Sequence, residues 1–407
     1  MRITIVGGGQ AGLQLAIGLR QKNLDVSVVS NRTPDDIHNG KVTSSQGMFD
    51  DALQSERDLG INFWEPECPN MDGMGLNVPA QDGAGLALHW AYQLDKPAQS
   101  VDQRIKYPGW MKHFEEIGGE LIIHEAGIAD LERYCRHSDL VIVASGKADI
   151  GALFERDAAR SPFDKPARTW GMIYVTGVAP VDGFSRFTVS LLPGIGECFV
   201  IPALTIDGAC NILAFAGLPG GPMDCWRDVH TPDDYLARAK QVLRQLIPWE
   251  AERCRNIALT DLNGILAGQL TPTVRKPVGQ LPSGALVLGM ADAVVLNDPI
   301  AGQGSNSAAK SARTYLNRIL ENGDKPFDHA WMQQTFDCFW DYAQWSTGFT
   351  NGFLMPPPPH VIKILGAAQT SPRIGRAFAN GFNDPRTFFP WFADPVEAER
   401  FIARDGA

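Results

Sequence analysis

The chain has 407 residues, which is enough for two domains or for one large domain with insertions. Its content of 44% hydrophobic and 20% charged residues is ordinary for a soluble globular protein. The formal net charge of -10 argues against a nucleic-acid partner, because nucleic-acid surfaces of proteins are usually basic.

The sequence also gives no support for a membrane protein or for a metal-binding protein. No apolar run approaches the roughly 20 residues of a membrane span, and residues 2–6 are too short for a signal-peptide core. The seven cysteines form no Cys-x-x-Cys pair, and the eight histidines show neither His-x-x-x-His nor His-Glu-x-x-His spacing. We therefore expect a cytoplasmic protein with reduced thiols, no membrane partner and no metal site.

The first elements predict a βαβ unit. Residues 2–6 (RITIV) are typical of a short buried strand, and glycines follow. The helical spacing of apolar residues then predicts a helix that ends at about residue 22, and residues 25–30 (DVSVVS) predict a second strand. This order implies parallel strands and an α/β domain.

The glycines between the first strand and the helix indicate a dinucleotide site. Gly7, Gly9 and Gly12 match Gly-x-Gly-x-x-Gly in the strand–helix context that this motif requires. Gly7 permits the tight turn, Gly9 lets a pyrophosphate approach the backbone, and Gly12 lets helix and strand pack closely. Gln10 and Ala11 open the helix, whose free N–H groups and positive dipole end would face the phosphates.

The acid that usually binds the ribose at the end of the second strand is absent. Ser30, Asn31 and Arg32 occupy this place, and a hydroxyl or an amide binds a ribose more weakly than a carboxylate does. Asp35 and Asp36 could replace the acid or could belong to a solvated loop. The sequence thus predicts a dinucleotide and leaves its ribose contact open.

Two kinds of structure follow along the chain. Residues 120–123 and 139–146 predict further strands of the first sheet. Between about 160 and 275, frequent Pro and Gly and short β-like runs predict a separate antiparallel sheet. Its expected strands and one helix cover residues 186–192, 197–206, 211–217 and 233–246.

The last third of the chain returns to the first domain and then becomes helical. Residues 285–292 predict a buried strand that ends in Asp292, and residues 305–323 predict a helix ended by glycine. After about residue 325 the pattern is aromatic-rich and helical. The proline run at 355–360 predicts a rigid corner between helices rather than a ligand for another domain.

The segment 289–308 favours FAD over NAD. It resembles the second flavin motif of the aromatic hydroxylases, Gly-Asp followed by Pro-x-x-Gly-x-Gly, with Ala291 in place of the usual Gly. In that motif Asp292 would bind the ribityl chain, and the helix N–H groups would stabilise negative charge on the flavin. The segment could also be an ordinary strand–loop–helix connection, but both motifs, expected at opposite ends of one sheet, favour FAD. The residues of this segment that we expect at the cofactor are Asp292, Pro299, Gly302, Gln303, Gly304, Ser305 and Asn306.

Nothing in the sequence indicates a nicotinamide site. No second Gly-x-Gly-x-x-Gly follows a strand, and residues 144–147 (ASGK) lack the Asp of the Asp-Gly motif in NADPH-using hydroxylases. We therefore expect a separate NAD(P)H:flavin reductase that supplies FADH2.

Taken together, these motifs resemble the FAD-dependent styrene and indole monooxygenases, the epoxidase components of two-component systems. The resemblance covers nearly the whole chain, and Arg104 at the end of SVDQR is expected to bind the cofactor on the same basis. Its other motifs are IVGGGQAGLQ, NRTPDD, ASGK, SPFDKP and NDPIAGQGSN. It implies a Rossmann-like FAD-binding domain of the aromatic-hydroxylase or glutathione-reductase type, with an inserted antiparallel substrate domain and C-terminal helices.

The expected domain boundaries follow from this resemblance and from the predicted elements. A discontinuous FAD-binding domain would comprise 1–45, 100–160 and 276–325, and a substrate domain 46–99 and 161–275. Residues 326–407 would form the C-terminal helical region.

Four positions are similar to the indole branch of the family. Ser44, Gln46, Met48 and Ala98 match that branch, whereas the styrene branch carries Asn, Val, His and Ser. The resemblance implies that these four residues contact the substrate and that Ser44 or Gln46 positions the substrate or a peroxide. Without it, TSSQ would be a polar loop and Met48 a core residue.

The implied reaction begins with FADH2 and O2, which form a C4a-hydroperoxyflavin. Its distal oxygen would epoxidise the C2–C3 bond of indole, leading to indoxyl and indigo, and would also oxidise styrene-like alkenes and aryl sulfides. A styrene epoxidase, a self-contained NADPH-dependent hydroxylase and a non-catalytic flavin-binding protein are the alternatives. A halogenase is less favoured, because no tryptophan lies in a Trp-x-Trp-x-Ile-Pro motif. The sequence does not determine the oligomeric state, for which a homodimer is one expectation.

Overall fold

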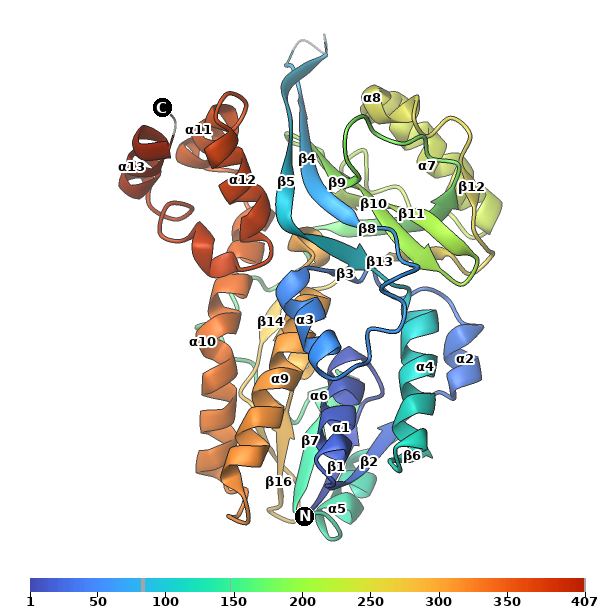
Figure 1. Ribbon diagram of the computed structural model, residues 1–407, viewed down its shortest axis with the longest axis vertical. Helices are drawn as coiled ribbons and strands as arrows, with labels where there is room; N and C mark the ends of the chain where they lie inside the picture. Colours follow the sequence, from blue (N-terminus) through green and yellow to red (C-terminus); the bar gives the residue numbers. More distant parts are fainter. Residues whose placement is uncertain (82–84, 147, 406–407) are drawn as a thin grey trace.

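The computed structural model describes residues 1–81, 85–146 and 148–405. A mostly parallel sheet with its helices forms the lower part in Figure 1, and a large, mostly antiparallel sheet forms the upper part. The end of the ASGK motif, Lys147, lies outside the described residues. No described helix is long and apolar enough to cross a membrane.

The lower sheet has six strands in the order β15-β16-β7-β1-β2-β6. All neighbouring pairs are parallel except β15–β16, so the predicted parallel βαβ unit is confirmed. In chain order the strands are β1 (Arg2–Val6), β2 (Asp25–Ser30), β6 (Glu120–Ile123), β7 (Leu140–Val143), β15 (Val278–Gln280) and β16 (Leu286–Gly289).

The strand order corrects one expectation. The two cofactor motifs do not lie at opposite ends of the sheet, because β1 and β16 are separated only by β7. The helices that follow them, α1 (Gln10–Gln21) and α9 (Gly304–Asn322), pack together, and a Cβ at Gly18 would lie 2.7 Å from a methyl of Leu316. Both helix N-termini therefore belong to one region of the molecule.

A second correction concerns the strand before the flavin loop. This strand, β16, ends at Gly289, and Asp292 lies in the 3-10 turn η1 (Ala291–Ala293). The extended backbone stops there because Ala291 has a φ of +51°, a left-handed conformation. The Gly that usually occupies this position in the motif adopts that conformation without strain.

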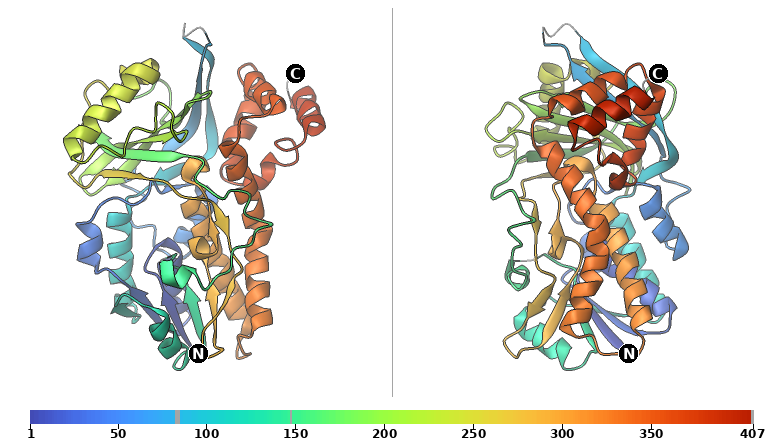
Figure 2. Two further views of the ribbon diagram at one scale, coloured as in Figure 1. Left: turned by 180° about the vertical axis from the view of Figure 1, so that it is seen from behind. Right: turned by 90° about the vertical axis from the view of Figure 1, so that its left-hand side faces the viewer.

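The remaining helices of the lower part lie around this sheet and beside α9. Figure 2 shows α10 (His329–Leu354) running along α9. The others are α2 (Pro34–His38), α3 (Asp50–Asp58), α4 (Gln103–Glu116), α5 (Ile128–Cys135) and α6 (Ala148–Gly151).

The upper sheet follows the path β12-β8-β11-β10-β9-β4-β5-β3, with β13 also paired to β8. It is antiparallel except for the parallel pair β4–β9, and the predicted strands at 186–192, 197–206 and 211–217 are confirmed. Its strands are β3 (Gly47–Met48), β4 (Met71–Pro79), β5 (Leu86–Ser100), β8 (Thr169–Thr176), β9 (Arg186–Leu192), β10 (Gly196–Thr205), β11 (Gly208–Gly217), β12 (Ala258–Leu259) and β13 (Ile265–Gly268). A small sheet pairs β14 (Thr273–Val274) with β17 (Val295–Leu296).

The two faces of the upper sheet are covered by different elements. The predicted helix α7 (Pro232–Leu246), followed by α8 (Pro248–Ala251), packs its apolar side against one face. The C-terminal helices α11 (Pro359–Ala367), α12 (Pro372–Gly381) and α13 (Pro395–Asp405) belong to the aromatic cluster on the other face. The proline corner is confirmed, because α10 ends at Leu354 and α11 begins at Pro359. The division of the chain into domains remains a prediction.

Candidate active site

The loop between β16 and α9 borders a cavity of about 290 Å³, which we call the flavin cavity because the predicted flavin motif borders it. Residues of β8 and β13 and the segment before β3 form its other walls. Among the predicted cofactor residues, those that line it are Asp292, Pro299, Gly302, Gly304 and Ser305. Ser44 and Gln46, predicted at the substrate, line this same cavity.

The glycines of this loop leave room for a flat ring against the backbone. A Cβ added at Gly302 or Gly304 would meet no atom within 4 Å, and Gly302 has a left-handed φ of +60°. The helix α9 begins at Gly304 without a side-chain cap, so its first N–H groups stay available to a ligand. This arrangement fits an electron-rich flavin edge.

Asp292 is the acidic group of this cavity. Its side chain is exposed to the cavity space, yet protein atoms surround that space, and this desolvation raises the pKa of the carboxyl to about 6. A hydroxyl of a bound ribityl chain would supply the hydrogen bond that stabilises the carboxylate.

Two polar residues that the sequence did not assign to the site have buried side-chain atoms without a hydrogen-bond partner among the described residues. Asn297 lines the cavity, and neither its amide oxygen nor its nitrogen has a hydrogen-bond partner among the described residues. Asp298 is fully buried, and burial raises the pKa of its carboxyl to about 6, although the backbone N–H of Ile300 donates to it at 3.0 Å. The indole N–H of Trp170 lies close enough to lower that pKa but is not aligned as a full hydrogen bond. An unpaired amide suits the pyrimidine edge of a flavin, which carries both donors and acceptors.

A second cavity, of about 210 Å³, lies at the other motif. It is lined by Gly7, Gly9, Ser30, Asn31 and Arg32, so the structure brings the predicted pyrophosphate and ribose residues together. A Cβ at Gly9 would meet open space, which leaves the backbone accessible to a phosphate. By contrast, a Cβ at Gly12 would lie 2.0 Å from the carbonyl oxygen of Gly7, as close helix–strand packing requires.

The ribose end contains a carboxylate that the sequence pattern did not reveal. Glu125 follows β6, the strand beside β2, and lines the same cavity as Ser30 and Asn31. The hydroxyl of Ser30 is itself engaged with the backbone of Arg32 at 2.8 Å. Glu125 could be found only by knowing that β6 lies beside β2 in the sheet.

The segment before β3 is held in a strained conformation by a tyrosine. Gln46 has a φ of +34°, and its side-chain amide donates to the hydroxyl of Tyr174 at 2.7 Å. That hydroxyl in turn donates to the backbone carbonyl of Ser44. Tyr174 is fully buried, so it fixes the two polar residues that face the flavin cavity.

An apolar cavity adjoins the first cavity across the loop at 299–302. The two share Ser45, Gly47, Trp170, Pro299 and Gly302 as lining residues. Aromatic and aliphatic side chains that the sequence did not predict supply the remaining walls, namely Phe49, Met71, Phe187, Phe199, Ile201, Ala214, Ile300, Ala301 and Phe382. This cavity measures about 60 Å³, so a small aromatic molecule would lie against the loop that borders the flavin cavity only after the surrounding side chains move apart.

Other predicted residues lie away from these three cavities. Met48 and Ala98 are buried, and neither belongs to the lining of the three. The sulfur of Met48 accepts from Lys106 at 3.3 Å, beside the buried Lys106–Glu56 ion pair. Arg104 is also absent from these linings, because its guanidinium pairs with Asp102 and Asp261, each at 2.8 Å.

The side chains of three further predicted cofactor residues are used inside the protein. Gln10 bonds Gln14 and Glu56, each at 3.1 Å, and Gln303 donates to Phe382 at 3.0 Å. Ala11 is buried at the start of α1 and presents only backbone groups.

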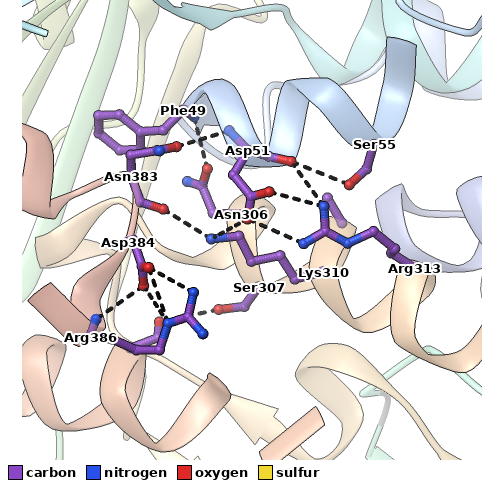
Figure 3. Close-up of polar contacts among 12 residues, drawn as sticks. Phe49, Asp51, Ser55, Asn306, Ser307, Lys310, Arg313, Asn383, Asp384 and Arg386 are labelled. Atoms are coloured by element: carbon purple, nitrogen blue, oxygen red, sulfur yellow. Dashed lines mark hydrogen bonds and ion pairs between the residues drawn. The ribbon is translucent and has the colours of Figure 1, made fainter. Parts of the chain in front are cut away.

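Asn306 joins the loops on both sides of the site. Its side-chain oxygen accepts from the N–H of Phe49 at 2.8 Å, and its nitrogen donates to the carbonyls of Gly302 at 2.8 Å and Gly47 at 3.0 Å. One turn further along α9, the buried Lys310 pairs with Asp51 at 3.1 Å. Figure 3 shows how this network continues to Asn383, directly after Phe382: its carbonyl accepts from Lys310 and its side-chain oxygen accepts from the N–H of Asp51.

Comparisons with known proteins identify relatives of this chain. Residues 146–253 match the family described as "Styrene monooxygenase A putative substrate binding domain". The chain is 29% identical over 405 residues to the styrene monooxygenase StyA of Pseudomonas fluorescens, covering 97% of this chain and 95% of that one. A second StyA, from Pseudomonas sp, has the same identity and coverage.

Solved structures share the fold at low identity. The flavin-dependent brominase Bmp2 has a TM-score of 0.68 and 16% identity, with 99% of each chain covered. A flavoprotein/dehydrogenase from Cytophaga hutchinsonii has a TM-score of 0.67 and 13% identity, with 95% of each chain covered. These similarities confirm the predicted Rossmann-like FAD-binding fold.

Proposed function

We propose that this chain, which is an FAD-dependent monooxygenase of the styrene monooxygenase type, epoxidises the C2–C3 bond of indole and the vinyl group of styrene-like alkenes. Reduced FAD, when bound, supplies two electrons to O2. One oxygen atom then enters the alkene as an epoxide, and the other leaves as water. Aryl sulfides would be oxidised to sulfoxides by the same oxygen transfer.

The observation that carries this proposal is the apolar cavity beside the flavin cavity. A ring between Phe187, Phe199 and Phe382 would lie against the same loop, at Pro299 and Gly302, that borders the cofactor space. Its aromatic walls exclude water and suit an uncharged planar substrate. The protein then positions the double bond and needs no side-chain nucleophile.

Indole rather than styrene is favoured by the loop before β3. Ser44, Gln46 and Met48 match the indole branch, and Gln46 and Ser44 place polar groups in the flavin cavity. Either residue could position the substrate or the oxygen to be transferred. Because Met48 is buried against Lys106, we propose that it acts by shaping this loop and not by touching the substrate.

The cofactor would be delivered in the reduced form by a separate NAD(P)H:flavin reductase. Asp292 would hold the ribityl chain, Asn297 and the N-terminus of α9 the flavin ring, and Gly7 and Gly9 the pyrophosphate. At the ribose, Glu125 would replace the acid missing at the end of β2.

One assay separates this function from its alternatives. The purified chain receives FADH2 from a separate reductase with O2, and indole and styrene are tested in parallel. Indigo formed faster than styrene oxide supports the proposal, and the opposite ratio supports a styrene epoxidase. Rapid NADPH oxidation by the chain alone would indicate a self-contained hydroxylase. Release of hydrogen peroxide with neither product would contradict epoxidation.

A further inference from the structure

A fourth cavity, of about 350 Å³, lies on the opposite face of the upper sheet from the apolar cavity. Side chains alternate between the two faces of a strand, and on β9 Phe187 lines the apolar cavity while Thr188 lines this one. Among the described residues, no lining residue is shared with the flavin cavity or the apolar cavity. We call this space the arginine cavity, after Arg186 and Arg253 in its wall.

Arg186 lies flat on the sheet with donors left over. A Cβ at Gly75 would come within 3.2 Å of its Nε, so the missing side chain of Gly75 makes room for the guanidinium. One terminal nitrogen donates to the backbone carbonyls of Asp182 at 2.8 Å and Phe184 at 3.2 Å. The Nε is buried and has no hydrogen-bond partner within the described ranges. The second terminal nitrogen donates to no described residue, and it is the donor that a ligand in the cavity would reach.

Arg186 has no carboxylate of a described residue in direct contact. The buried Glu250 is already bound to Arg253 at 2.6 Å and accepts from Thr188 at 3.3 Å and Asn77 at 3.4 Å. Arg186 forms no ion pair shorter than 4.0 Å with any described residue, and Asp182 attracts it only from a distance. Burial, and then the like charge of Arg253, lower the pKa of Arg186. Asp182 also lines the cavity, so the carboxylates equal the arginines in number, but Arg186 is the guanidinium that no described carboxylate contacts.

The rest of the wall combines the polar residues Asn77, His89 and Asp182 with apolar and aromatic ones. Trp249 lies over the sheet with its indole N–H bonded to Ser190 at 2.9 Å, and Pro180, Val181 and Leu86 line the cavity beside it. A planar carboxylate matches the two-pronged geometry of a guanidinium better than a spherical anion does. An aromatic ring attached to that carboxylate would cover the apolar wall.

We propose that the arginine cavity binds an aromatic carboxylate, with its carboxylate on Arg186 and Arg253 and its ring against Trp249. This site does not depend on the epoxidation proposed above, because the upper sheet separates it from the flavin cavity and from the apolar cavity.

Calorimetric titration of the FAD-loaded protein with benzoate tests the proposal. Saturable binding should become about tenfold or more weaker in Arg186→Gln, the loss expected for one charged hydrogen bond. Arg186→Lys should recover part of the affinity. The control Arg244→Gln, at an exposed position of α7, should bind as the wild type does. Equal benzoate affinity in wild type and Arg186→Gln would overturn the proposal.

Two further measurements keep the result interpretable. Gly75→Ala retains both arginines but pushes a methyl against the Arg186 guanidinium, so it should also weaken benzoate binding. If circular dichroism shows that Arg186→Gln is unfolded, Gly75→Ala becomes the deciding variant. Unchanged benzoate affinity in Gly75→Ala would contradict binding of the carboxylate at Arg186. Inorganic phosphate should bind at least tenfold more weakly than benzoate. Phosphate binding as tight as that of benzoate would refute an aromatic ligand.

Discussion

The side-chain oxygen of Asn306 accepts a hydrogen bond from the backbone N–H of Phe49 at 2.8 Å, joining two segments 257 residues apart in the chain. Phe49 lines the apolar cavity, and the same Asn306 amide donates to Gly302, which borders both that cavity and the flavin cavity. One buried side chain thus sets the position of Phe49 in the apolar cavity relative to the loop at 299–302.

Asn306→Ala should uncouple flavin oxidation from substrate oxidation. The change leaves the N–H of Phe49 and the carbonyl of Gly47 without their partners in a buried place, so the two loops separate. We expect the ratio of epoxide to hydrogen peroxide to fall severalfold and the free energy of unfolding to fall by about 1–3 kcal/mol. The control is Asn322→Ala, at the exposed end of α9, where the amide donates to the carbonyl of Lys325. An unchanged product ratio in Asn306→Ala would contradict a positioning role.

Tyr174→Phe should disturb the polar side of the site. It removes the hydroxyl that accepts from Gln46 and donates to Ser44, and so releases a backbone held at a φ of +34°. The expected cost in unfolding free energy is about 1–2 kcal/mol, together with a lower rate of indole oxidation. Tyr134→Phe is the matched control, since its buried hydroxyl has no partner among the described residues. Equal rates of indole oxidation in the two variants would show that Tyr174 does not help to position the groups of the site.

These two relationships show where sequence patterns stop being informative. The strands and helices around both motifs could be predicted, because hydrophobic period and glycine position are local signals. Contacts such as Gln46–Tyr174 depend on the register of distant strands, and no local pattern encodes them. The turn at Asp292 was missed because Ala291, unlike Gly, gives no sign of a left-handed conformation. Met48 was expected at the substrate, but its place beside Lys106 follows from tertiary packing alone.

Asp292→Asn should change both cofactor affinity and the pH dependence of stability. The variant loses a charged hydrogen bond to the ribityl chain, so FAD should bind about tenfold or more weakly at pH 7. In the cofactor-free protein, folding raises the pKa of this carboxyl from 3.8 to about 6. The folded state therefore holds the proton more tightly, and stability falls as pH rises through this window. The stability of Asp292→Asn relative to wild type should increase between pH 4 and pH 7, as thermal unfolding would measure. A constant difference would show that Asp292 is not desolvated.

Glu125→Gln should weaken FAD binding if this carboxylate holds the ribose. The substitution keeps the size of the side chain and removes its charge, so the expected loss is again about tenfold in affinity. Riboflavin, which lacks the adenosine part, should bind wild type and variant equally. Glu115→Gln, at an exposed position of α4, controls for net charge. Equal FAD affinities in wild type and Glu125→Gln would leave Ser30 and Asn31 as the ribose contacts.

Phe382→Leu should widen the range of substrates. Phe382 forms part of the apolar cavity, whereas the nearby Phe388 lies in the same aromatic cluster but not in the cavity wall. Removing ring volume at Phe382 makes room for a longer aryl alkene, so the rate with such a substrate relative to styrene should rise severalfold. Phe388→Leu creates a comparable void behind the wall and should lower the thermal midpoint without changing this ratio. If both variants change the ratio equally, general loosening of the aromatic cluster explains the effect, and Phe382 does not contact the substrate.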